Sequence, residues 1–199
     1  AVDATLRVLK GEDTTAFCAI RPPGHHALRS GPMGFCLFNN VAIAARAALA
    51  GGVERLMIVD WDVHHGNGTQ AEFYQDGRVG FYSIHRSPFY PGTGDANETG
   101  TGPGLGWIAN SPVPADIDTR TFFETFSRGI ETLAAKVRPQ LILLSAGFDA
   151  HREDPVGGLC LVEEDFGELT QVVRKLASSY CDGKVVSLLE GGYHLEHMP

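Results

Sequence analysis

Five short runs of the sequence are almost continuously apolar, and a polar cluster directly follows each of them. Such runs are typical of parallel β-strands buried on both faces, because strands with one solvated face alternate apolar and polar residues. We predict strands over residues 15–20, 55–59, 79–84, 141–144 and 185–189, and the clusters after them read RPPGHH, DWDVHHGNG, HRSPFYPGTG, SAGFDAH and EGGYH. Ligands of parallel sheets bind beyond the carboxyl ends of the strands, so we expect these clusters to meet at one edge.

Segments with helical periodicity separate the predicted strands. We predict helices over residues 41–50, 119–137 and 163–180, and the last of these opens with acidic residues, as a helix N-terminus prefers. Strands that alternate with helices predict an α/β fold with a parallel sheet and right-handed crossovers. We expect a single domain over residues 1–199 that is part of a longer fold. The Gly/Pro-rich stretch 88–114 shows no periodicity and is predicted to be one long structureless loop.

The charge balance limits which binding partners we expect, and the cysteine content indicates a cellular location. The chain has 199 residues, 16 Lys and Arg, 24 Asp and Glu, and a formal net charge of −8. That balance argues against direct nucleic-acid binding, which needs a basic surface, but it suits a basic peptide or a polyamine. No leader or membrane-spanning segment is recognisable, so we expect no membrane partner. The four cysteines are widely spaced, which predicts free thiols and a cytoplasmic location.

The cluster after the second predicted strand has the composition of a metal site. Asp60, Asp62 and His64 stand at alternate positions, so they point to one side if the chain stays extended. Asp149, after another strand, adds a fourth candidate ligand. Carboxylates and imidazole without thiolates fit a catalytic zinc with three protein ligands and an open position, and they equally suit manganese or iron. The alternative is a solvated cluster at the end of a strand.

Two further clusters supply groups for acid–base catalysis. His25 and His26 follow a stiff Pro-Pro-Gly turn, and Asp60 and Asn67 are available to orient the two rings. An oriented histidine beside an activated water acts as a general base and then as a general acid. The hydroxyl of Tyr193, after two glycines, is a candidate donor to an oxyanion, although EGGY alone also suits an ordinary turn with a core tyrosine.

Other aromatic and histidine residues have less specific interpretations. Four aromatic residues of the same loops suit either the core or the walls of a substrate tunnel, namely Phe35, Phe89, Tyr90 and Phe148. We interpret His151, His194 and His197 as surface residues without a function. All five remaining histidines stand in the polar clusters and are expected at the site, namely His25, His26, His64, His65 and His85.

The sequence resembles a known family. RPPGHH, GFCLFNNVAIAA, VDWDVHHGNGTQ, SIHRSPFYPGTG, SAGFDAH with DPVGGL, and LLEGGY occur in the order and spacing of the histone deacetylases. The resemblance extends over about residues 15–195. It is strongest to the class II branch and its bacterial relatives, because Asn67 stands where class I has Asp.

The resemblance implies the arginase/deacetylase fold and a role for each motif residue. Zinc is then held by Asp62, His64 and Asp149. His25 pairs with Asp60, while His26 pairs with Asn67 and is the principal general base and acid. Tyr193 polarises the acyl carbonyl. Family members also have segments before and after this span. The N-terminal one contains an acidic residue that binds the substrate backbone.

The resemblance further implies a tunnel and structural potassium ions. The tunnel for the acyl-lysine stem is lined by Gly34, Phe35, Tyr90 and Val156. One potassium ion is held by Asp60, Asp62, His64, Ser83 and the carbonyl of Ile84. A second lies near Phe73, Asp76, Val79 and Trp107.

The leading hypothesis is zinc-dependent hydrolysis of N-acetyl-lysine in proteins or peptides, with release of acetate. The weakly active class IIa branch carries His where this chain has Tyr193, so the resemblance implies an active enzyme. Val156 is apolar where a polyamine-selective member carries an acidic residue, which favours acyl-lysine over an acetylpolyamine or another small amide as the substrate. Two hypotheses of different classes stand beside these: a non-catalytic module that binds acyl-lysine, and a binuclear-manganese ureohydrolase.

Overall fold

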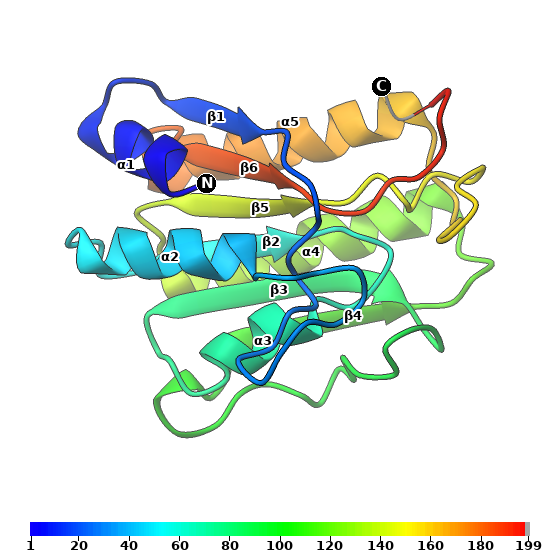
Figure 1. Cartoon of the computed structure of the whole chain (residues 1–199), viewed down its shortest axis with the longest axis horizontal. Coiled ribbons are helices and arrows are strands. Elements are labelled where there is room, and N and C mark those ends of the chain that lie inside the picture. Colours follow the sequence, from blue (N-terminus) through cyan, green and yellow to red (C-terminus); the bar gives the residue numbers. More distant parts are fainter. Residues whose placement is uncertain (198–199) are drawn as a thin grey trace.

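The computed structural model describes residues 1–197 and is built on one parallel sheet (Figure 1). Its six strands lie in the order β1-β6-β5-β2-β3-β4, and all neighbours run parallel. The strands are β1 (Thr15–Cys18), β2 (Leu56–Asp60), β3 (Val79–Arg86), β4 (Ile108–Val113), β5 (Ile142–Ala146) and β6 (Val185–Leu189). Every carboxyl end therefore points to the same edge of the sheet.

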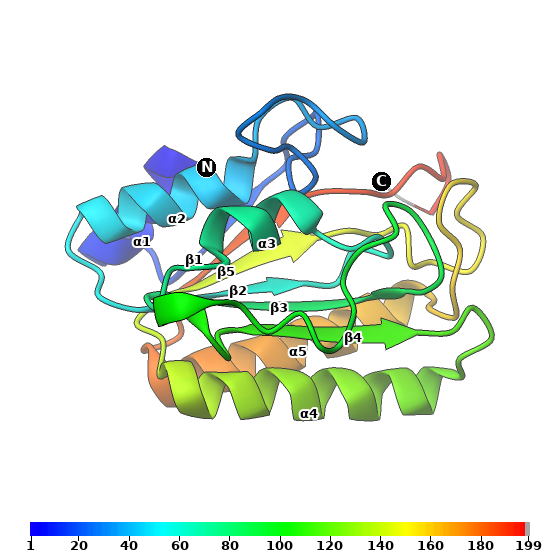
Figure 2. The same cartoon turned by 90° about the horizontal axis from the view of Figure 1, so that it is seen from below.

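Helices cover both faces of the sheet (Figure 2). α1 (Val2–Lys10), α2 (Asn40–Ala50) and α3 (Asn67–Phe73) lie on one face, while α4 (Thr119–Val137) and α5 (Glu163–Tyr180) lie on the other. This three-layer arrangement confirms the α/β fold class expected from the alternation of strands and helices. Among the described residues, no helix combines the length and the hydrophobicity needed to cross a bilayer.

Local sequence signals explain where the main helices begin. The side chain of Asp118 accepts a hydrogen bond from the backbone N of Thr121 at 2.9 Å, and this N-cap starts α4. Asn39 caps α2 in the same way through the backbone N of Ala42. The apolar stripe of α4 then packs on the sheet through Phe122, Phe126 and Ile130, together with Leu133 and Val137.

The buried centre of the sheet gives the site a rigid base. All residues of β2 and β5 are buried, because each strand is covered by a helical layer on both faces. Burial of such continuous apolar strands stabilises the fold by about 25 cal/mol per Å² of apolar surface removed from water. The loops at their carboxyl ends therefore start from fixed positions.

Three expectations from the sequence need correction. β1 is an edge strand that is partly exposed, with Phe17 57% accessible, so it is not buried on both faces as predicted. Residues 88–114 are not structureless, because they contain β4 and the short 3₁₀ helix Gly102–Gly104. The sequence patterns also gave no indication of α1 and α3, which cover the sheet beside α2.

Candidate active site and metal centre

The alternation of β2 continues beyond its last hydrogen-bonded residue and separates polar from apolar side chains. Trp61 and Val63 pack in the core that includes α4. Asp60, Asp62 and His64 are buried away from that core. The carboxylate of Asp60 accepts the backbone N–H of Asp62 at 3.1 Å, and Asp62 accepts that of His64 at 2.9 Å. These bonds hold the three polar side chains at the carboxyl edge.

Asp149, from the loop after β5, completes a group of three potential ligands with Asp62 and His64. Nδ1 of His64 lies 3.0 Å from Oδ2 of Asp149 and 3.1 Å from Oδ1 of Asp62. One ligand atom of each residue lies within 4.8 Å of the others, and all three residues are buried. Two carboxylates and one imidazole nitrogen fit a divalent ion of the zinc type that keeps a coordination position open.

The electrostatics of this group favour a bound cation. Burial, together with the charge of Asp62, raises the pKa of Asp149 to about 7. Burial disfavours the imidazolium of His64, but hydrogen bonds to Asp149 and Asp62 outweigh it and raise the pKa of His64 to about 9. Two carboxylates without access to water need a compensating positive charge, which a divalent ion would supply.

Two glycines let the backbone pass against the carboxylates. A Cβ on Gly147 would collide with the side chain of Asp62, and one on Gly191 would collide with the carboxylates of Asp149 and Asp62. The backbone N–H of Gly191 instead donates to Oδ2 of Asp62 at 2.8 Å. The EGGY motif therefore orients a potential ligand as well as ending β6.

Each of the two neighbouring histidines has its own side-chain partner. Nδ1 of His25 lies 3.0 Å from Oδ2 of Asp60, and Nδ1 of His26 lies 2.7 Å from Oδ1 of Asn67. Burial opposes the charge on His25, but the carboxylates of Asp62 and Asp60 raise its pKa well above the usual value. Burial and the positive charge of His25 lower the pKa of His26 to about 3. The surroundings therefore favour the charged form of His25 and the neutral form of His26.

Tyr193 is fixed through its backbone by a residue that the sequence patterns did not single out. The backbone N of Tyr193 donates to Oδ2 of Asp154 at 2.7 Å. Arg21 donates to the carbonyl oxygens of Glu190 and Gly192, and its guanidinium lies 5.5 Å from the centre of the Tyr193 ring. Burial raises the pKa of Tyr193, so its hydroxyl stays protonated and can donate. Arg21 belongs to the RPPGHH motif and Asp154 to the DPVGGL motif. Their place in these motifs was the sequence signal that could have identified them.

One pocket of about 460 Å³ is lined by His25, His26, His64 and Tyr193, but not by Asp62 or Asp149. Its lining consists of Pro23, His25, His26, Gly34, Phe35, His64, Phe89, Tyr90, Val156 and Tyr193. Phe35 and Tyr90 are 70% and 45% exposed, so they lie toward solvent, whereas Phe89 stacks on His64 with 5.0 Å between ring centres. Phe148 does not line this pocket and packs against Phe166. The pocket thus brings together the four tunnel residues expected from the resemblance and Phe89, which was also a candidate for the tunnel wall.

Two of the five clustered histidines lie outside this pocket, contrary to expectation. Nδ1 of His65 lies 2.8 Å from the hydroxyl of Thr93, and Nε2 of His85 lies 3.1 Å from the carbonyl of Gly94. Both rings are buried, and burial lowers the pKa of His65 to about 4 and that of His85 to about 3. They are neutral residues that fix the loop between β3 and β4.

The structure gives contacts for two further residues that were proposed to hold potassium, Ser83 and Asp76. Ser83 pairs with Asp60 in the β2–β3 register, and its hydroxyl lies 2.9 Å from Nδ1 of His85. Asp76, proposed for the second ion, is already ion-paired with Arg46 and Arg78. Both potassium sites stay predictions from the family resemblance.

His151 is not a surface residue, as was expected from the sequence. It is only 5% exposed, because the chain after Tyr193 folds over it. Its ring stacks on His197 with 4.8 Å between ring centres, and His197 lies 4.4 Å from His194. His194 and His197 are half-buried. The three histidines interpreted as functionless therefore form a cluster of their own.

Comparison with known proteins gives the site a family context. The model of the histone deacetylase domain matches residues 1–199. The chain belongs to the histone deacetylase family. It is 43% identical over 196 residues to a probable deacetylase of Archaeoglobus fulgidus, which covers 98% of this chain and 55% of the relative. It is 46% identical to histone deacetylase 14, chloroplastic, of Arabidopsis thaliana, over 92% of this chain and 43% of the relative.

Solved structures agree with this assignment. The HD domain of HDA15 superimposes with a TM-score of 0.92 at 39% identity, over 99% of this chain and 57% of that structure. An acetylpolyamine aminohydrolase from Burkholderia pseudomallei gives a TM-score of 0.89 at 36% identity, over 98% of this chain and 56% of that structure. The fold is therefore that of the deacetylases. The chain spans about half the length of the relatives it matches. The cytoplasmic location expected from the cysteines stays a prediction.

Proposed function

We propose that this chain carries the catalytic site of a zinc-dependent deacetylase that hydrolyses the amide of N-acetyl-lysine in proteins or peptides. One observation carries the proposal. The potential ligands Asp62, His64 and Asp149 lie together, and His64 lines a pocket whose walls also contain His26 and Tyr193. A metal ligand, a neutral base and a hydroxyl donor facing one cavity are the parts that amide hydrolysis requires.

Asp62, His64 and Asp149 would hold the zinc ion, which would supply a Lewis acid for the acyl carbonyl and lower the pKa of a bound water toward neutrality. The remaining steps belong to side chains of this chain. His26 donates a hydrogen bond from Nδ1–H to Oδ1 of Asn67, which leaves the lone pair of Nε2 free to take a proton from the attacking water. Oxygen then bonds to the carbonyl carbon, and the carbonyl oxygen gains negative charge.

Tyr193 and the two histidines complete the reaction. The Tyr193 hydroxyl donates a hydrogen bond to the developing oxyanion, an interaction that typically contributes about 3–4 kcal/mol to transition-state stability. When the C–N bond breaks, the imidazolium of His26 returns its proton to the departing amine. The carboxylate of Asp60 orients the ring of His25 beside this centre. The second proton of the water also passes to the amine, so the products are acetate and the ammonium form of the amine.

The substrate follows from the pocket wall. Val156 lines the pocket and offers no charge to a second ammonium group, whereas a polyamine carries several. We therefore favour acetyl-lysine over acetylpolyamine. The likeness to an acetylpolyamine aminohydrolase keeps the polyamine as the second candidate.

Side-by-side assays of amine release test this proposal. The zinc-loaded whole protein is given an acetyl-lysine peptide and an acetylpolyamine, with Tyr193→Phe as control. Turnover of the peptide that collapses in the variant supports the proposal. Preference for the polyamine replaces the substrate and keeps the mechanism. Absence of turnover with stoichiometric zinc at the site contradicts it and favours a module that binds acyl-lysine without hydrolysis.

A further inference from the structure

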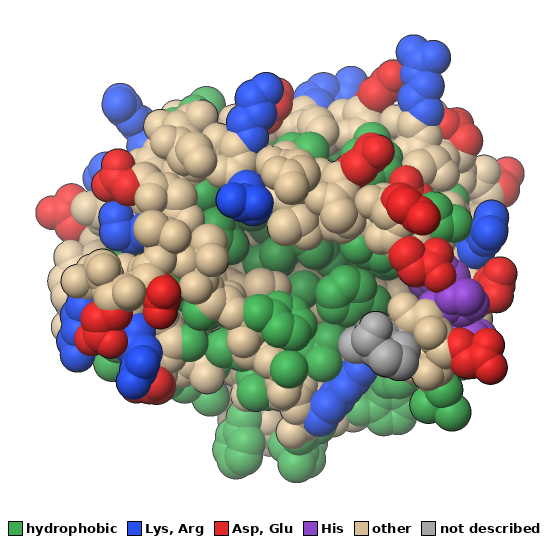
Figure 3. All heavy atoms as spheres, turned by 90° about the horizontal axis from the view of Figure 1, so that it is seen from above, with side chains coloured by type: hydrophobic (Ala, Val, Ile, Leu, Met, Phe, Trp, Pro, Cys, Tyr) green, Lys and Arg blue, Asp and Glu red, His purple; other side chains and the backbone are tan. Residues whose placement is uncertain are grey.

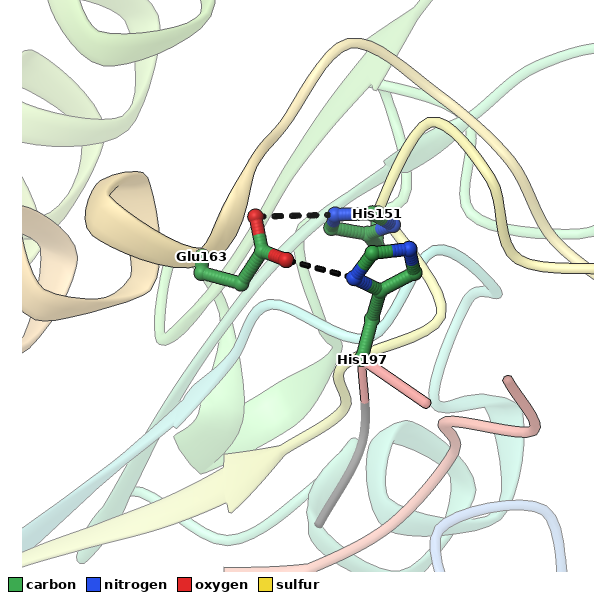
Figure 4. Close-up of side chains that lie close together, drawn as sticks. All are labelled: His151, Glu163 and His197. Atoms are coloured by element: carbon green, nitrogen blue, oxygen red, sulfur yellow. Dashed lines mark hydrogen bonds and ion pairs between the residues drawn. The ribbon is translucent and has the colours of Figure 1, made fainter. Parts of the chain in front are cut away.

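A second group of potential metal ligands lies apart from the pocket. His151 follows β5, Glu163 is the first residue of α5, and His197 lies beyond Tyr193 (Figure 4). Nδ1 of His197 lies 2.6 Å from Oε1 of Glu163, and Nε2 of His151 lies 3.4 Å from Oε2 of the same carboxylate. One ligand atom of each residue lies within 4.8 Å of the others.

We propose that His151, Glu163 and His197 bind a second divalent metal ion of the zinc type. Two imidazoles and one carboxylate are the ligand set that zinc and its neighbours in the transition series prefer, with a remaining position for water. The ion joins three segments that are distant in the sequence, and one of them directly follows Tyr193. This inference does not depend on the deacetylase mechanism.

The strongest support comes from His151. This ring is 5% exposed, and its Nε2 is a buried nitrogen without a hydrogen-bond partner among the described residues. The nitrogen nevertheless faces the carboxylate of Glu163 (Figure 4). A buried polar atom without a partner is costly, so each case in a folded protein needs an explanation. A metal ion between His151 and Glu163 provides one.

His197 has the environment of a ligating histidine. Its Nδ1 faces Glu163, while its Nε2 lies 3.1 Å from Oε2 of Glu153. Ligating histidines commonly donate their second ring N–H to a carboxylate, which fixes the ring and increases its basicity. For His151, binding through Nε2 moves the ring proton to Nδ1 and gives up a 3.2 Å contact with the backbone N of Glu153. That contact is the structural cost of binding.

Charge and access also suit a cation. Glu163, Glu164 and Asp165 form the acidic first turn of α5, which offsets the positive end of the helix dipole. The cluster borders a cleft of about 520 Å³ that is also lined by Phe17, Phe148 and Phe166. Figure 3 shows histidine side chains among acidic ones at one end of this face. An ion therefore has a path from solvent.

Zinc stoichiometry of the purified whole protein tests the proposal. After dialysis against buffered Zn²⁺, wild type is expected to hold one equivalent more than His151→Gln and than His197→Gln. Glu163→Gln should lose the same equivalent, whereas Glu164→Gln, one residue further along the exposed first turn, should retain it. Equal zinc content in wild type and both histidine variants would overturn the proposal and leave His197 as a hydrogen-bonded link between Glu163 and Glu153.

A second set of variants distinguishes zinc bound at this site from zinc bound at the proposed catalytic site. His64→Ala removes a proposed catalytic ligand and should keep one zinc equivalent, which disappears when His197→Gln is added. The same ion should raise the melting temperature of His64→Ala and leave that of the double variant unchanged. Loss of the equivalent on His194→Gln but not on His151→Gln would place the ion on the neighbouring group Glu153, His194 and His197 and would contradict the assignment.

Discussion

Oδ1 of Asn67 lies 2.7 Å from Nδ1 of His26, so the ring donates a hydrogen bond to an uncharged amide. A carboxylate at the same place would stabilise the imidazolium by its charge, which an amide cannot do. His25 differs in this respect, because its partner is the carboxylate of Asp60 at 3.0 Å. The carboxylate thus favours the charged form of His25, whereas burial and the charge of His25, rather than Asn67, favour the neutral form of His26.

The first prediction concerns this partner of His26. Asn67→Asp should raise the pKa of His26 by about 1 unit or more, because the new carboxylate favours the imidazolium. The proposed base works only when it is unprotonated, and kcat/KM therefore falls below its pKa. The acidic limb of the kcat/KM profile should move to higher pH by the same amount. A limb that stays in place would show that His26 is not the group that controls it.

The second prediction concerns the hydroxyl of Tyr193. Tyr193→Phe should lower kcat by about 10²–10³, the typical cost of losing one donor to an oxyanion. The backbone bond from residue 193 to Asp154 does not involve the side chain, so the fold should be retained. Steady-state kinetics and circular dichroism measure the two effects. A kcat within a few-fold of wild type would remove Tyr193 from the mechanism.

The third prediction makes Asp154 a positioning residue for Tyr193. Oδ1 of Asp154 accepts the backbone N–H groups of Val156 and Gly157 at 2.9 Å, and Oδ2 accepts that of Tyr193. Asp154→Asn keeps the first oxygen but turns an amide N–H₂ toward the backbone N–H of Tyr193, which leaves two donors facing each other. We expect kcat to fall about tenfold or more, because small displacements of a catalytic group are costly.

Non-additivity separates this positioning role from a general effect on stability. In the Tyr193→Phe background, Asp154→Asn should reduce kcat little further, since the hydroxyl that it positions is already absent. A full additional tenfold loss in the double variant would mean that Asp154 acts on the site by another route.

The sequence predicted the strands and the polar residues at their carboxyl ends well, because the signals for them are local. Buried parallel strands read as continuous apolar runs, and β6 has the predicted boundaries while β2 and β5 differ by one or two residues. The alternation of Asp60, Asp62 and His64 needs only an extended chain. The carboxyl ends then converge through the topology of parallel sheets, whatever the sequence between them.

The missed features depend on contacts between distant segments. β4 contains Asn110, Ser111 and Pro112, which are unusual for a strand and are tolerated because it forms the edge of the sheet. Burial of His151 results from the chain around His197, which no local pattern indicates. β1 was predicted to be buried because its run is apolar, but only one of its sides pairs with a neighbouring strand in the described chain.

The last prediction concerns the close approach of Gly191 to the proposed metal ligands. Gly191→Ala introduces a methyl group that collides with carboxylate oxygens of Asp149 and Asp62. These carboxylates must then rotate away from His64. We expect the free zinc concentration for half-maximal activity to rise about 10–100-fold, as when groups that orient metal ligands are lost.

Gly167→Ala is the matched control for Gly191→Ala. Gly167 lies in α5, and a Cβ added there meets no atom within 4 Å. Alanine favours the helix by roughly 0.5–1 kcal/mol over glycine, so this variant should become more stable toward urea while its zinc requirement stays unchanged. Assays in chelator-buffered zinc compare the two variants directly. If both variants require the same zinc concentration as wild type, the backbone at Gly191 does not control the orientation of Asp62 and Asp149. Their placement then depends on the hydrogen bonds from the backbone N–H groups of Val63 and His64.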